Sequence, residues 1–115
     1  MLKHLVVAIA SLVAFDAVAA KNTVLRCQGY QVGDRHRLAD QTITLDMESN
    51  LVISIQLGNA NSKDIINAPI KLSKNELQWS YEAVNKKYVF NRQTSGLRLL
   101  SNTLELIGVF ECSTF

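Results

Sequence analysis

The chain has 115 residues, of which 12 are Lys or Arg and 10 are Asp or Glu, so its formal net charge is +2. This near balance excludes the strongly basic footprint of nucleic-acid-binding and membrane-surface proteins. The length allows one small domain with a modest core.

The first twenty residues have the layout of a secretory signal peptide. A short basic head precedes an apolar run, Leu5–Phe15, and small residues follow. We expect cleavage after Ala19 or Ala20. A membrane-spanning helix needs about 20 apolar residues, and Asp16 interrupts the run well before that length. The prediction is therefore a cleaved leader over residues 1–20 and a single domain over residues 21–115, periplasmic or secreted and not attached to a membrane.

Alternation of apolar and polar residues predicts about eight short strands in the mature chain and no helix. Pro69 restricts the fourth strand to a sheet edge, a bulge or a strand end. In chain order the predicted strands are Val24–Tyr30, Gln41–Met47, Leu51–Leu57, Ile65–Leu72, Glu76–Glu82, Lys87–Arg92, Leu97–Leu100 and Leu104–Cys112.

The parity of each strand predicts which side chains face the core. In the third strand these are Leu51, Ile53, Ile55 and Leu57; in the last they are Leu104, Leu106, Phe110 and Cys112. Gly108 shares this face and is expected to leave room for a bulky neighbour such as Trp79. The predicted core aromatics are Trp79, Tyr81, Tyr88, Phe90 and Phe110.

Cys27 and Cys112 lie on apolar faces at opposite ends of the mature chain. In an oxidising compartment they are expected to form one disulfide, with two free thiols as the alternative. Bridged Cα atoms lie roughly 4.4 to 6.8 Å apart, so the first and last strands should be neighbours. The predicted fold is all-β: an antiparallel meander in a closed or nearly closed barrel, preferred over a sandwich.

Catalytic chemistry is hard to assemble from these residues. His36 is the sole histidine of the mature chain and lies between two arginines in a polar loop, where it is expected to be a solvated surface group. One histidine and two distant cysteines do not supply a clustered metal site. Serine lacks a nucleophile-elbow context, and the strand glutamates have outward parity. We therefore predict a protein that is not an enzyme and needs no metal or cofactor.

Arg92 shares parity with Tyr88 and Phe90, so it points inward if its strand continues. Two interpretations stay open. In the first, Arg92 plugs the barrel or bonds loop carbonyls, with stacking on Trp79 as one candidate contact. In the second, it is a basic group at the barrel mouth, joined by Arg98 or His36, that binds an acidic partner.

Three short motifs carry a resemblance. Cys27-x-Gly29, Asn91-Arg92-x-Thr94-Ser95-Gly96-Leu97 and Phe110-Glu111-Cys112 resemble small exported bacterial proteins of unknown function, in which Asn-Arg-x-Thr-Gly ends a strand and a cysteine closes the domain. Here Ser95 lies between the threonine and the glycine and lengthens the loop. The resemblance implies a periplasmic all-β domain and transfers no activity.

The chain is also similar, more weakly, to the exported barrel inhibitors of C-type lysozyme. Ser80-Tyr81 and Thr94-Ser95-Gly96 resemble parts of their motifs but lack the glycine and the lysine. Two functions remain open. One is a module that binds a periplasmic or extracellular protein, such as a cell-wall hydrolase, through loops Gln31–Asp40 and Gly58–Asp64. The other is a carrier of a small apolar ligand in the barrel lumen.

Overall fold

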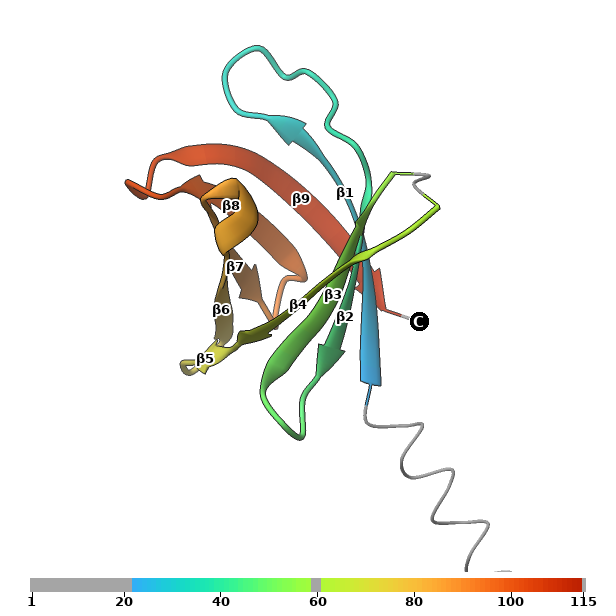
Figure 1. The fold of residues 1–115 in the computed structure, drawn as a ribbon. Coiled ribbons are helices and arrows are strands. Elements are labelled where there is room, and N and C mark those ends of the chain that lie inside the picture. The colour runs from blue at the N-terminus through green and yellow to red at the C-terminus, as the bar shows by residue number, and fades with distance from the viewer. Residues whose placement is uncertain (1–21, 59–60, 115) are drawn as a thin grey trace, which may run out of the picture.

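The computed structural model describes residues 22–58 and 61–114, so the predicted leader and its cleavage site lie outside the described residues. Within these two ranges no helix is long and apolar enough to span a membrane. The described chain forms one antiparallel sheet that curls around a buried core (Figure 1).

Over the described residues the sheet has nine strands, which are neighbours in the order β4-β3-β2-β1-β9-β8-β7-β6-β5. One short 3₁₀ turn, η1 (Glu82–Val84), connects β6 to β7. The strands are β1 (Asn22–Gln31), β2 (Gln41–Asp46), β3 (Leu51–Leu57), β4 (Asp64–Pro69), β5 (Lys71–Leu72), β6 (Glu76–Tyr81), β7 (Lys86–Asn91), β8 (Gly96–Ser101) and β9 (Leu106–Thr114).

The first and last strands close the sheet. The ladder between β1 and β9 pairs residues 25–31 with residues 108–114, and Cys27 lies directly opposite Cys112. The two cysteines form a disulfide with 4.0 Å between their Cα atoms. The predicted all-β, nearly closed barrel with a disulfide between its first and last strands is confirmed.

The predicted fourth strand is divided in two, which makes nine strands rather than eight. β4 ends at Pro69, which has no backbone N–H to continue a ladder. The N–H of the next residue, Ile70, donates to the carbonyl of Asn50. β4 pairs with β3, whereas β5 pairs with β6. The bend at Ile70 therefore passes the chain from one side of the barrel to the other.

Aromatic side chains fill the lumen, as their parity predicted. Trp79 and Tyr88 are stacked, with ring centroids 5.3 Å apart, and Tyr81 packs 6.4 Å from Tyr88. The hydroxyl of Tyr88 donates to Oε1 of buried Gln41 at 2.7 Å. The predicted core aromatics are all buried: Trp79, Tyr81, Tyr88, Phe90 and Phe110.

β-Bulges change which side chains of β3 face the core. The β2–β3 register shifts opposite Thr44 and Leu45, so Ile53 is skipped and Val52 takes the buried position. Of the four residues predicted to face inward on β3, only Ile55 is buried. An extra residue on one strand reverses the parity beyond it.

The start of the last strand needs a similar correction. The β8–β9 register shifts between Leu99 and Leu100, and Leu104 and Leu106 are exposed rather than buried. Gly108 does leave room for a bulky side chain, but that side chain is Leu38: a Cβ on Gly108 would lie 2.8 Å from Leu38 Cδ1. Leu38 thus occupies the place that the sequence suggested for Trp79.

Candidate functional site

The two loops proposed for recognition lie at the same end of the barrel. The N–H of Gly58 donates to the carbonyl of Asp40 at 2.6 Å, which joins the β1–β2 and β3–β4 connections. The antiparallel register places the β7–β8 turn at the opposite end, beside Cys112. Figure 1 shows the β1–β2 loop extending beyond the strands. The proposed loops are therefore together, and separate from the turn that carries Arg92.

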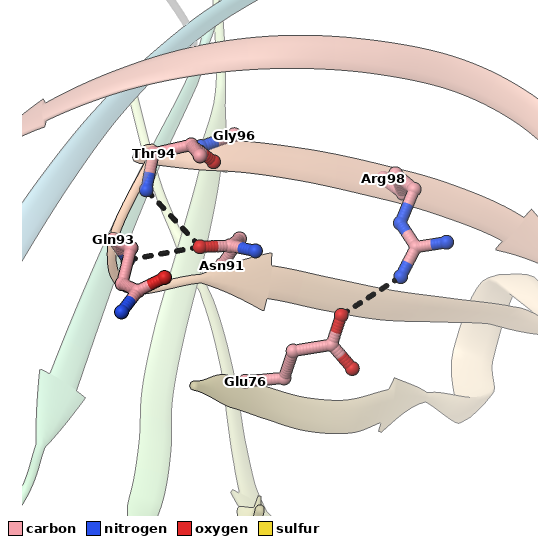
Figure 2. Close-up of polar contacts among 6 residues, drawn as sticks. All are labelled: Glu76, Asn91, Gln93, Thr94, Gly96 and Arg98. Carbon is pink, nitrogen blue, oxygen red and sulfur yellow. Dashed lines mark hydrogen bonds and ion pairs between the residues drawn. The ribbon is translucent and has the colours of Figure 1, made fainter. Parts of the chain in front are cut away.

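The Asn91-to-Gly96 motif builds that turn. Oδ1 of Asn91 accepts hydrogen bonds from the N–H groups of Gln93 and Thr94 at 2.9 and 3.0 Å (Figure 2). Oγ1 of Thr94 accepts from the N–H of Gly96 at 3.2 Å. Ser95, the extra residue, has a left-handed φ of 62°, and its carbonyl accepts from the N–H of Cys112. Each of these side chains has a local role in shaping the hairpin.

Arg92 is exposed, which corrects its predicted inward position. β7 ends at Asn91, so Arg92 begins the turn and the strand parity no longer applies. Its N–H donates to the carbonyl of Asn75 at 2.8 Å. Trp79 stacks on Tyr88 instead. Of the two interpretations, the plug is wrong, and a role in binding a partner stays a prediction.

A row of side chains crosses the outer face of the barrel near the loop end. Tyr30 on β1 is bridged to Arg37 on one side and paired with Val109 of β9 on the other. Val109 is paired in turn with Arg98 of β8. Paired residues lie on the same face of a sheet, close enough for their side chains to interact. We call these four residues the outer row: an apolar centre with an arginine on each side.

The outer row borders a groove of about 750 Å³ beneath the β1–β2 loop. Tyr30 is 55% exposed and Val109 is 45% exposed, although both are large apolar groups in regular strands. Val32, also exposed, and Arg35 line the same groove. Arg35 has a left-handed φ of 61°, a backbone conformation that is uncommon outside glycine and asparagine.

Both arginines of the outer row are held by exposed ion pairs. Arg98 extends from β8 across β7 to Oε2 of Glu76 on β6, at 3.0 Å (Figure 2). Arg37 lies 3.3 Å from Oδ1 of Asp40. Exposed pairs of this kind contribute only about 0 to 1 kcal/mol to stability. A carboxylate from another molecule could replace either acidic partner at small cost.

His36 is the chain neighbour of Arg37 but is not one of the four residues of the outer row. Its side chain is exposed in the β1–β2 loop, and its N–H donates to Oδ1 of Asp34 at 2.9 Å. The structure thus places His36 and Arg98 near the loop end and Arg92 at the other end. Sequence reasoning did not single out Tyr30 or Val109; the available signal was large apolar groups at outward parity.

A second groove, of about 640 Å³, opens through the barrel wall between β4 and β6. No ladder joins these strands in the described sheet, whose order ends at β4 on one side and β5 on the other. The hydroxyl of Tyr81 donates a hydrogen bond to Oδ2 of Asp64 across the opening. We call this groove the side window.

Burial is the main cause that raises the pKa of Tyr81 to about 12, with further contributions from the hydrogen bond to Asp64 and from its negative charge. Burial also raises the pKa of Tyr88, against the effect of its hydrogen bond to Gln41. Both hydroxyls therefore remain protonated at neutral pH and act there as hydrogen-bond donors.

The described residues contain no group of three or more His, Cys, Asp or Glu side chains that could hold a metal ion. Comparisons with protein-family models, with curated proteins and with solved structures find no match to this chain. The function is therefore inferred from the residues of this chain alone.

Proposed function

We propose that this protein is exported and acts as a binding module that recognises an acidic surface of another protein through the outer row. The observation that carries the proposal is the arrangement of Tyr30 and Val109 between Arg37 and Arg98. Aromatic and arginine side chains are enriched at protein interfaces, where they supply most of the binding energy. The disulfide fits an oxidising compartment.

A cell-wall hydrolase is the first class of partner to test. Glycosidases carry a pair of carboxyl groups in an open cleft, and the flanking arginines would complement those charges. The resemblance to exported lysozyme inhibitors supports the same class. The β1–β2 loop carries Arg37 of the outer row and extends beyond the strands (Figure 1), so it could enter such a cleft.

The carrier of a small apolar ligand in the lumen is the weaker proposal. Stacked Trp79 and Tyr88 occupy the middle of the barrel, and Leu38 packs against Gly108 near one end. A barrel of this size is commonly filled by its own side chains.

The test measures binding of C-type lysozyme, and of periplasmic proteins at moderate salt, to the wild type and to two matched variants. Tyr30→Ser removes an apolar group that is 55% exposed, and Leu104→Ser removes one that is 61% exposed outside the outer row. We expect Tyr30→Ser to weaken binding at least tenfold and Leu104→Ser to leave it unchanged. Equal affinities of the two variants for a captured partner would contradict the proposal.

The charged part of the surface has its own pair of variants. Arg98→Gln removes an arginine of the outer row, and Arg92→Gln removes an exposed arginine at the opposite end. Weakening by Arg98→Gln alone supports the outer row. Weakening by Arg92→Gln alone would move the binding site to the β7–β8 turn.

A further inference from the structure

The side window has the features of a second binding site, independent of the outer row. Its volume of about 640 Å³ falls within the range of roughly 300 to 1,000 Å³ typical of small-molecule sites. Its wall is apolar where it meets the core, at Ala68 and Trp79, and Ile65 at its rim is 60% exposed.

Two lysines line the outer rim of the side window, and Glu82 also lines it, so these three groups carry a net charge of +1. Lys71 is paired with Gln78 across β5 and β6. Lys87 is paired with Ser80 across β6 and β7. Gln78 and Ser80 are two positions apart on β6, so both lysines lie on the outer face, one on each side of that strand. Among residues 22–58 and 61–114, neither ammonium group has an acidic partner.

An unpartnered donor lies in the same wall. Trp79 is 2% exposed, and its indole Nε1 has no hydrogen-bond acceptor in the described part of the chain. Buried donors are nearly always satisfied by protein, water or ligand. Trp79 lies on the core face of β6, so an acceptor would have to pass the rim of the side window to reach this nitrogen.

The two ends of the side window limit what can occupy it. β5 pairs with β6 at one end, and the Tyr81–Asp64 hydrogen bond crosses the opening at the other. Figure 1 shows β4 and β6 diverging from β5. An added peptide strand would have to run past these closures to pair along either edge, whereas a short molecule fits between them.

We propose that the side window binds a small amphipathic acid, whose apolar body lies against Ile65, Ala68 and Trp79 and whose carboxylate is held by Lys71 and Lys87. The acid differs from the apolar cargo of a lumen carrier in both charge and position. The proposal does not depend on the outer row, since the two grooves share no lining residue.

Decanoate is the probe, and 1-decanol is its uncharged counterpart. Trp79 is the only tryptophan of the chain, so its fluorescence reports occupancy directly. We expect a saturable change in emission with decanoate and binding at least tenfold weaker with decanol. Equal affinity for the two probes, or no saturable change with decanoate, would overturn the proposal.

Matched lysine variants locate the carboxylate. Lys71→Gln and Lys87→Gln should each weaken decanoate binding by about five- to tenfold, because each removes a charge-assisted hydrogen bond. Lys74→Gln, an exposed lysine outside the lining of the side window, is the control and should bind as the wild type does. An equal loss in all three variants would indicate non-specific charge attraction and overturn the proposal.

A peptide tests the competing occupant. If the neutral extended peptide acetyl-Val-Thr-Val-Thr-Val-amide displaces decanoate and binds more tightly, the side window is an edge for strand addition and the proposal is wrong. Failure of the peptide to compete supports the small acid.

Discussion

The barrel has two seams, and they are built in opposite ways. Where β1 meets β9, the ends of the chain are joined by a continuous ladder and a disulfide. Where β4 faces β6, strands close in sequence are joined, among the described residues, only at the ends of the opening, by β5 and by the Tyr81–Asp64 hydrogen bond. The covalent link thus secures the seam whose closure costs the most chain entropy, and the local seam remains open enough to form a groove.

The largest expected effect comes from breaking the disulfide at the terminal seam. Cys27 and Cys112 are 85 positions apart, so the bridge strongly restricts the unfolded chain. Reduction should lower the free energy of unfolding by about 4 kcal/mol in the chain-entropy model. Urea unfolding of the oxidised and reduced protein, followed by circular dichroism, measures the difference. A loss below about 1 kcal/mol would show that the ladder alone closes this seam.

A smaller effect should follow from crowding the same seam at Gly29. A Cβ at this position would collide with the backbone carbonyl oxygen of Val109 and lie 2.6 Å from Cδ2 of Phe110, both on the neighbouring strand β9. We expect Gly29→Ala to destabilise the protein by about 1 to 3 kcal/mol through overpacking. Gln28→Ala, at the exposed neighbouring position, should change stability by less than about 0.5 kcal/mol. If the two variants are equally stable in urea, the packing of β9 against Gly29 is not tight.

Opening the side window should cost less. Tyr81→Phe removes the hydroxyl that joins β6 to Asp64, and exposed Asp64 can then be hydrated. The expected loss is about 1 kcal/mol. Hydrogen exchange should quicken at β4 amides and not at β1 amides, because only the local seam loosens. Tyr30→Phe, at an exposed tyrosine, is the control. Equal exchange changes in both seams would mean that they are not independent.

The smallest expected effect on stability appears only at alkaline pH and comes from the ionisation of Tyr81. Below pH 10 the hydroxyl is protonated in both the folded and unfolded protein, so it adds no pH dependence. Between pH 10 and about 12 the unfolded state loses this proton first, because the folded pKa is raised to about 12. Stability should therefore fall with pH across this window. The fall should be shallower in Tyr81→Phe; identical profiles would contradict the raised pKa.

The alternation of apolar and polar residues predicted the buried side chains correctly where a strand is regular. On β6, Leu77, Trp79 and Tyr81 alternate with polar neighbours, and all three are buried as predicted. The same reasoning failed on β3 because the bulge at Ile53 inserts a residue and reverses the parity beyond it. It failed at Arg92 because β7 ends one residue earlier than predicted, and strand ends are set by the turn rather than by alternation.

The candidate sites were less accessible to sequence reasoning than the fold. Arg98 and the β1–β2 loop were identified, but the outer row was not, because its members come from four separate segments. The side window depends on Pro69 and the bend at Ile70, and on β5 pairing with β6 instead of β3. The proline was recognised as a break in the strand, yet nothing local says where the chain goes after it.

The sequence by itself determined the all-β class, most of the strands, the aromatic core and the pairing of its two cysteines. Period-two alternation acts locally, and two cysteines allow only one intramolecular pair. Only the tertiary structure decided that Tyr30 and Val109 lie between Arg37 and Arg98, and that the wall opens between β4 and β6. Cross-strand register controls both features, and register depends on bulges and bends that bring distant segments together.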